Sequence, residues 1–165
     1  TGQSGELLLR GPNLFREYWQ NPAATTEAIE DGWFHTGDIG YRDERGFVFI
    51  HDRKKDMVIS GGENIYPAEL EQVLSGVPGI KEAAVVGMPD AKWGEVPVAV
   101  VVAVVPGTLT VDGICKAFEG VLARYKHPRA VVFTSVLPRN AMGKVLKEEL
   151  RDALSTGTIE MVERS

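Results

Sequence analysis

The side chains in this 165-residue chain that could carry out chemistry are scattered. His35, His51, His127 and Cys115 are far apart and lack the spacing of a zinc site. Ser60–Gly62 resembles a phosphate-binding turn only loosely, because no lysine–serine pair follows it. No nucleophile elbow, Walker loop or dinucleotide fingerprint is present. Taken singly, these residues predict a soluble α+β domain without a metal site.

Asp38 and Lys144 are two further candidates with ordinary alternatives. Asp38 ends the sequence FHTGD, where an aspartate commonly caps a local turn. Lys144 follows Met142-Gly143 just before an expected helix, where a lysine is by default solvated. Cys115 falls within another expected helix, and we expect it to be an inert, partly buried thiol.

The stretch Asp52–Glu69, DRKKDMVISGGENIYPAE, separates two parts of the chain that differ in character. Short strands and turns precede it, and alternating helices and strands follow it. Spacing alone favours a β-hairpin with a glycine turn at Gly61-Gly62. The charged residues 52–56, which we call the seam, followed by such a turn would also suit a junction between two parts that move relative to each other.

Hydrophobic periodicity and turn residues predict the elements that position these side chains. Before the seam we expect a strand at 6–9, a helix at 23–29, a turn at 31–32, and two strands (at Tyr41 and 47–50) joined by the turn 42–46. After it we expect a helix from Pro67 to Gly76, a strand at 80–86, a loop at 87–95, a strand to Val105, a helix capped by Thr110 and reaching Tyr125, a strand at 130–133, a loop at 137–144 and a last helix carrying Leu146, Leu150, Ala153 and Leu154. This order predicts a small α+β domain.

Composition limits the possible classes of function. A net charge of −5 gives no general attraction to nucleic acid or to an acidic membrane. The longest apolar run, Val96–Val105, is interrupted by Pro97 and is too short for a transmembrane segment. A single cysteine excludes an internal disulfide framework and predicts a reducing, cytoplasmic location. Because the chain opens on Thr1 in turn-forming sequence, we expect a fragment of something longer.

Three ordered motifs change the interpretation of these residues. They are FHTGD at 34–38, DRKKDMVISGGENIYPAELE at 52–71 and LPRNAMGK at 137–144. Together they closely resemble the C-terminal signature motifs of the adenylate-forming enzymes, which include acyl- and aryl-CoA synthetases, the adenylation domains of peptide synthetases, and beetle luciferases. The resemblance covers essentially the whole chain, which looks most like fatty acyl-CoA ligases. The motif GGENIYP at 61–67 looks most like acyl-CoA synthetases and aryl-CoA ligases, which favours CoA as the acceptor.

The resemblance implies a two-part organisation. Residues 1–52 would be the β-rich tail of the large AMP-binding domain, and residues 53–165 the small C-terminal lid domain, which rotates between half-reactions and has a short central sheet flanked by helices. In the family, the phosphate loop and the magnesium-binding Thr-Glu pair lie far upstream of these motifs, outside the part that this sequence resembles. We therefore expect the Mg²⁺ ligand outside this chain, the missing N-terminal domain as a partner, and no adenylation activity from the fragment alone.

The resemblance also implies residue roles. Asp38 resembles the carboxylate that accepts both ribose hydroxyls of ATP, Arg53 the arginine near ribose and phosphates, and Lys55 the hinge residue. Lys144 resembles the catalytic lysine of adenylation, which stabilises charge at the α-phosphate. The expected coenzyme A contacts are Gly61, Gly62, Trp93, Tyr125, His127 and Arg129, although Trp93 and Tyr125 fit a core role equally well.

The implied reaction converts a carboxylic acid, ATP and CoA into acyl-CoA, AMP and pyrophosphate through an acyl-adenylate, with a fatty acid as the first choice of substrate. An aryl-CoA ligase is an alternative. A carrier-loading adenylation domain is disfavoured because no carrier segment follows Lys144. A stand-alone protein-binding module is disfavoured because such a module would be expected to begin at the seam.

Overall fold

The computed structural model describes residues 2–159 and 162–163. Its chain divides into two compact units, Thr1–Lys55 and Asp56–Ser165. The predicted boundary after residue 52 falls just before this division, near the end of the strand Val48–Arg53. The assignment of the two units to a large-domain tail and a lid remains a prediction. The α+β class, with a central sheet flanked by helices, is confirmed.

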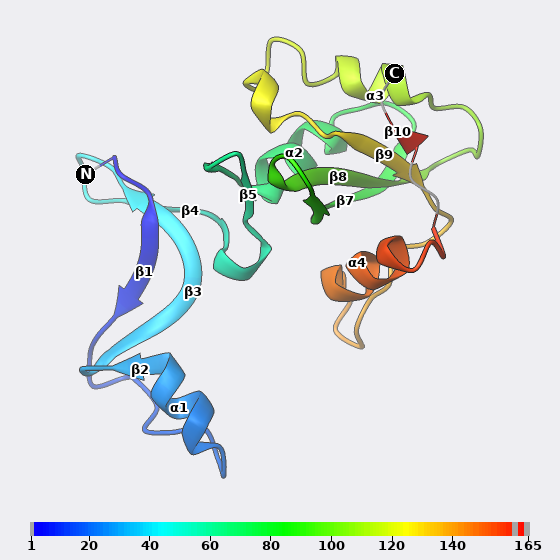
Figure 1. Ribbon diagram of the computed structural model, residues 1–165. Coiled ribbons are helices and arrows are strands. Elements are labelled where there is room, and N and C mark those ends of the chain that lie inside the picture. The colour runs from blue at the N-terminus through cyan, green and yellow to red at the C-terminus, as the bar shows by residue number, and fades with distance from the viewer. Residues whose placement is uncertain (1, 160–161, 164–165) are drawn as a thin grey trace. The chain divides into compact units, whose positions relative to one another are not determined.

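The first unit is an antiparallel sheet with one short helix (Figure 1). Its elements are β1 (Gly5–Leu9), α1 (Pro22–Ala28), β2 (Ile29–Glu30), β3 (Trp33–Arg42) and β4 (Val48–Arg53). The long strand β3 pairs with β1, β2 and β4. Asn21 caps α1 by accepting a hydrogen bond from the amide of Ala24, and Pro22 occupies the first turn, as the sequence predicts.

The second unit is a mixed sheet with helices on both faces. Its elements are β5 (Val58–Ser60), β6 (Glu63–Ile65), α2 (Pro67–Ser75), β7 (Ile80–Asp90), β8 (Gly94–Ala103), α3 (Val111–Lys116), the 3₁₀ turn η2 (Arg124–Lys126), β9 (Ala130–Phe133), α4 (Lys147–Ser155) and β10 (Val162–Glu163). Another 3₁₀ turn, η1 (Lys54–Asp56), lies at the division between the units. The strand order is β10-β9-β8-β5-β6, with β7 also paired to β8. Only β8 and β9 pair in parallel among the strand pairs described, and α3 lies in the connection between them.

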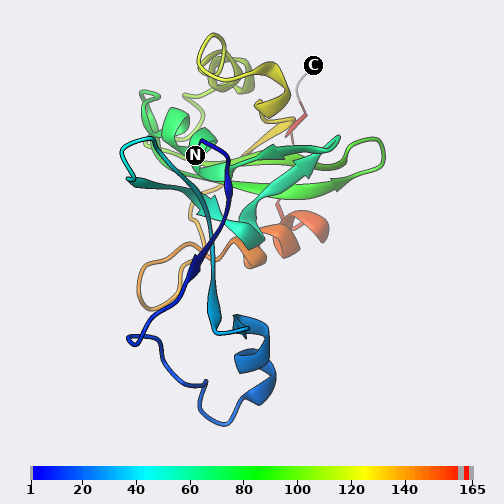
Figure 2. The same ribbon diagram turned by 90° about the vertical axis from the view of Figure 1, so that its left-hand side faces the viewer.

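Strand β8 separates two hydrophobic cores. Ala99 and Val101 contribute to the core that contains Leu70, Leu74 and Phe118. The alternate residues Val98, Val100 and Val102 contribute to the core that contains Leu137, Leu150 and Leu154. Figures 1 and 2 show α4 on one side of this sheet and α3 on the other. Because both faces are covered, the strand is apolar at successive positions, which explains the valine-rich run in the sequence.

The predicted loop at 87–95 is wrong. Strand β7 continues to Asp90 and pairs with β8 from Gly94 onward, so that only three residues join the two strands. The proline that favoured a loop, Pro89, is exposed in a strand for which β8 is the only partner described. A strand at the edge of a sheet tolerates proline because it can spare the missing amide donor.

The predicted helix from Thr110 to Tyr125 is also wrong in length. Thr110 does cap it, accepting a hydrogen bond from the amide of Gly113 at 3.1 Å, but α3 ends at Lys116. Turns follow, and Gly120 has a φ of +76°. A left-handed backbone conformation cannot continue a right-handed helix, so the periodic apolar residues beyond α3 pack from turns. Among the described residues, no helix has the length and apolarity needed to cross a membrane.

Candidate functional site

Asp38 and Arg53 form a direct ion pair within the first unit. They are cross-strand partners in the β3–β4 register, and Arg53 Nη1 lies 2.6 Å from Asp38 Oδ1. The same Nη1 donates to the carbonyl of Thr36 at 3.4 Å, and the Asp38 amide donates to Thr36 Oγ1 at 3.0 Å. The Asp38 side chain is 25% exposed, so its carboxylate is fixed by the strands yet accessible to a ligand.

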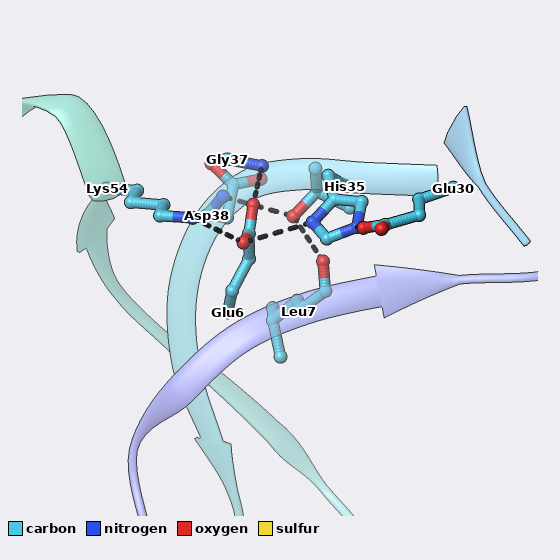
Figure 3. A network of polar contacts seen from close by, with 8 residues as sticks. Glu6, Leu7, Glu30, His35, Gly37, Asp38 and Lys54 are labelled. Carbon is cyan, nitrogen blue, oxygen red and sulfur yellow. Dashed lines mark hydrogen bonds and ion pairs between the residues drawn. The ribbon is translucent and has the colours of Figure 1, made fainter. Parts of the chain in front are cut away.

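Glu6 connects the backbone before Asp38 to strand β1 and to Lys54 (Figure 3). Its Oε1 accepts from the amide of Gly37 at 3.2 Å, and its Oε2 lies 2.8 Å from Lys54 Nζ and 3.2 Å from His35 Nδ1. The hydrogen bond from Lys54 lowers the pKa of Glu6 below its ordinary value. A cavity of about 600 Å³ is lined by Glu6, His35, Arg53, Lys54 and Lys55 among others, so this network forms one wall of a pocket.

Lys55 lies in η1, at the division between the two units. The residue before it, Lys54, is bound to Glu6 of the first unit. The residue after it, Asp56, is buried and lies 3.2 Å from Arg151 Nη2 of the second unit. Each neighbour of Lys55 is therefore held within its own unit, which is compatible with the hinge role implied for this position.

Gly61, Gly62 and Trp93 meet at the β5–β6 turn. The glycines have φ angles of +60° and +87°, which confirms the predicted glycine hairpin turn. The Gly61 amide donates to the carbonyl of Trp93 at 2.8 Å, and a Cβ on Gly61 would lie 2.8 Å from the Trp93 ring. Asp90 Oδ1 accepts from the amides of Lys92 and Trp93, and these bonds lower the pKa of Asp90.

Tyr125, His127 and Arg129 follow one another into β9 but differ in environment. Tyr125 is 51% exposed and Trp93 is 40% exposed, so neither is a core residue. His127 is buried, with its Nε2 3.0 Å from the carbonyl of Leu122. Arg129 is exposed, and its charge also contributes to the lowered pKa of Asp90.

Lys144 occupies a loop held by hydrogen bonds. Asn140 Oδ1 accepts from the amides of Met142 and Lys144 at 3.0 and 2.9 Å, and the Asn140 amide donates to the Lys144 carbonyl at 3.0 Å. The Lys144 side chain is exposed, and residues 2–159 supply no ion-pair partner for it. The chain therefore presents a cation that a bound anion could engage.

Reasoning from sequence missed three residues whose side chains bind the backbone or side chains around the predicted site. Glu6 binds Gly37 and Lys54, Asp90 binds Trp93, and Arg139 binds the carbonyl of Gly143. Glu6 gave no signal, because a glutamate in a short strand is ordinary. Arg139 stands inside the LPRNAMGK motif, whose only singled-out residue was Lys144. A metal site would require clustered ligands, and the described residues include no group of three or more His, Cys, Asp or Glu placed to hold an ion.

Comparison with known proteins shows that this chain is similar to the C-terminal part of CoA ligases. Residues 69–144 match the family of the AMP-binding enzyme C-terminal domain. The chain is 49% identical over 157 residues to the indoleacetate–CoA ligase of Aromatoleum aromaticum, covering 95% of this chain and 31% of that protein. It is 50% identical over 151 residues to a long-chain-fatty-acid–CoA ligase of Mycobacterium tuberculosis, covering 92% of this chain and 30% of that protein.

A solved structure is similar in fold as well as sequence. The o-succinylbenzoate CoA synthetase of Bacillus subtilis, in complex with its acyl-adenylate intermediate, superposes with a TM-score of 0.85 at 41% identity. The match covers 93% of this chain and 31% of that structure. The chain thus spans about 30% of the length of the relatives it matches.

Proposed function

We propose that this chain, which belongs to the adenylate-forming enzymes through its AMP-binding enzyme C-terminal domain, is the C-terminal part of an ATP-dependent acid–thiol ligase. The observation that carries the proposal is an exposed lysine, Lys144, on a hydrogen-bonded loop within that domain. The complete enzyme would convert a carboxylic acid, ATP and coenzyme A into acyl-CoA, AMP and pyrophosphate.

In the first half-reaction, an oxygen of the acid attacks the α-phosphorus of ATP and pyrophosphate leaves. Asp38 fits the ribose of this nucleotide, because its carboxylate offers several acceptor positions and Arg53 engages only Oδ1 among the contacts described. Lys144 would supply positive charge where negative charge develops on the phosphorus oxygens. We expect the Mg²⁺ that accompanies ATP to be held outside these 165 residues, in the N-terminal domain that completes the protein.

In the second half-reaction, the thiol of coenzyme A attacks the acyl carbonyl and AMP leaves. The exposed residues Gly61, Gly62, Trp93, Tyr125 and Arg129 are candidates to contact this substrate. His127 is a candidate only for indirect support, since it is buried against Phe118 at a ring-centroid distance of 5.7 Å. Lys55 is our candidate for the hinge between the two steps.

A fatty acid is our first choice of substrate, supported by the similarity to a long-chain-fatty-acid–CoA ligase. An arylacetate is the alternative, because the similarity to an indoleacetate–CoA ligase is almost equal in identity. We also propose a cytoplasmic location, for which the single, buried Cys115 is the supporting observation.

ATP–pyrophosphate exchange with a panel of fatty acids, arylacetates and succinylbenzoate tests the proposal. We expect exchange from the full-length protein and none from the 165-residue chain. Lys144→Ala in the full-length protein should lower the exchange rate by about 100- to 1,000-fold, the scale of losing one charge-stabilising group. It should leave acyl transfer from a preformed adenylate to coenzyme A nearly unchanged. Lys116→Ala, which removes another exposed lysine, is the matched control.

Exchange by the chain alone would show that a complete ATP site lies within these residues. An unaltered rate in Lys144→Ala would remove the lysine from the reaction. Absence of exchange from the full-length protein with every acid would favour a binding module instead.

A further inference from the structure

Arg139 connects the Lys144 loop to the central sheet of the second unit. Its Nη2 lies 2.5 Å from Oε2 of Glu82 on β7, and its Nη1 donates to the carbonyl of Gly143 at 2.5 Å. Gly143 is the residue immediately before Lys144. One guanidinium therefore joins a strand residue to the backbone that carries the lysine.

The two ends of this loop are fixed independently of Arg139. Leu137 and Leu150 are buried in the same core, and the Leu146 amide donates to the Pro138 carbonyl at 2.9 Å. The loop tip between them is open to solvent, with Met142 92% exposed. Within the tip, the Asn140 amide donates to the Lys144 carbonyl and the Gly143 amide donates to the Asn140 carbonyl. The side chains of Asn140 and Arg139 add further bonds to the tip backbone, and Arg139 is the one that also reaches the sheet.

We propose that Arg139, held by Glu82, is a positioning residue that fixes the backbone of Lys144 for adenylation. The inference rests on the proposed role of Lys144. A lysine is a compact charge on a flexible stem, so the place its charge can reach depends on a fixed backbone. A loop already in position needs little reorganisation when charge develops at the phosphorus.

The chemistry of the guanidinium suits this task. Its planar fork can donate to two acceptors at once, whereas one ammonium group would have to reach both from a single nitrogen. The hydrogen bond from Arg139 also lowers the pKa of Glu82, which keeps the carboxylate charged. Because both side chains are partly exposed, at 42% and 31%, the ion pair contributes little to global stability. We therefore expect variants at either position to fold.

The experiment measures the two half-reactions separately in the full-length enzyme. Arg139→Gln should lower kcat for ATP–pyrophosphate exchange by about 10- to 100-fold, the scale of a small misplacement of a catalytic group, with KM for ATP little changed. Transfer from preformed acyl-adenylate to coenzyme A should not change. Glu82→Gln should reproduce the effect in weaker form, because the neutral amide still accepts a hydrogen bond.

Further variants distinguish loss of the position of Lys144 from a general change in charge or a loss of folding. Lys81→Gln removes the neighbouring positive charge on β7 without touching the loop, and exchange should persist at its original rate. In the Lys144→Ala background, Arg139→Gln should produce no further loss, because the positioned group is gone. Hydrogen–deuterium exchange of the peptide spanning 140–146 should become faster in Arg139→Gln, which reports loop order without catalysis.

Each contrary outcome has a distinct meaning. If Lys144→Ala lowers exchange but Arg139→Gln does not, the positioning inference fails and the proposed function stands. Equal losses in both half-reactions, or an additive loss in the double variant, would also overturn it. If Lys144→Ala leaves exchange unchanged, the proposed role of the lysine fails and the inference fails with it. Should Arg139→Gln fail to fold, Glu82→Gln decides the same question.

Discussion

At the scale of single residues, the packing of Trp93 against the β5–β6 turn requires a glycine at position 61. The glycine adopts a left-handed conformation, and its missing side chain makes room for the indole ring. The 2.8 Å hydrogen bond between the Gly61 amide and the Trp93 carbonyl joins the β5–β6 turn to the end of the β7–β8 hairpin. A tryptophan can thus be 40% exposed and still fix a neighbouring turn.

Gly61→Ala should destabilise the second unit more than Gly62→Ala does. Both glycines have positive φ, which costs an alanine about 1–2 kcal/mol. Only the added methyl at Gly61 meets Trp93, whereas nothing lies within 4 Å of a Cβ at Gly62. Urea unfolding of the two variants measures the difference, and the indole NMR signal of Trp93 should shift only in Gly61→Ala. Equal free energies of unfolding and unshifted indole signals in both variants would contradict the packing of Gly61 against the ring.

At the scale of elements, α4 is positioned by its buried leucines and by two ion pairs, one from its first residue, Lys147, and one from Arg151 in its middle. Leu150 and Leu154 pack with Val86, Val100 and Val132 on one face of the sheet. Lys147 Nζ lies 2.8 Å from Glu71 of α2, and Arg151 pairs with Asp56 near the start of the unit. Since α4 begins three residues after Lys144, the packing of this helix also fixes one end of the lysine loop.

Leu150→Ala should reduce the free energy of unfolding of the second unit by about 2–5 kcal/mol, because the side chain is fully buried and a cavity would remain. Asp152→Ala, an exposed change on the same helix, should stay within about 0.5 kcal/mol. Chemical denaturation of the 165-residue chain measures both. A loss below about half a kcal/mol for Leu150→Ala would show that the helix does not bury this leucine.

At the scale of the whole molecule, the chain comprises two units with separate polar networks. Glu6 connects β1, β3 and Lys54 in the first unit, while Glu82, Asp56 and Glu71 form their ion pairs in the second. The hydrogen bond from Lys54 lowers the pKa of Glu6 in the first unit, and the hydrogen bond from Arg139 lowers the pKa of Glu82 in the second, so acid should weaken the two units through different carboxylates. The hydrogen bonds to Glu6 serve the first unit alone.

Glu6→Gln should change the acid sensitivity of the first unit selectively. The folded pKa of Glu6 lies below 4.5, so its contribution is fully present above that pH and is lost as pH falls through the lower folded value. In the wild type, the free energy of opening measured by hydrogen exchange at the amides of β1 and β3 should fall over that range by up to about 1 kcal/mol, the scale of an accessible ion pair. Glu6→Gln should already lack this contribution near neutral pH.

Amide hydrogen exchange between about pH 6 and about pH 3 measures this effect, with Glu44→Gln in the β3–β4 turn as the matched control. Amides of β7 and β8 should respond alike in all three proteins. A wild-type acid profile in Glu6→Gln, or an equal change in both units, would overturn the assignment.

The sequence by itself determined the type and order of most helices and strands, and it contained the three motifs from which the family was inferred. Local chemistry sufficed for these: Asn21-Pro22 starts α1, Gly61-Gly62 forms a hairpin turn, and the apolar run after Val96 fits a strand buried on both faces. The order of the predicted elements also indicated an α+β fold, and the resemblance of the three motifs indicated an adenylate-forming family; the comparisons support both.

Only the tertiary structure decided the length of β7 and α3 and the partners of the polar side chains. Proline in β7 is tolerated because of where that strand lies in the sheet. α3 gives way to turns after Lys116, and the left-handed backbone of Gly120 prevents a helix from reaching Tyr125. Arg139 and Glu82 are far apart in sequence, as are Glu6 and Lys54, so neither pair has a local signature. Contacts across such separations depend on the register of strands and the packing of helices, which no short stretch of sequence encodes alone.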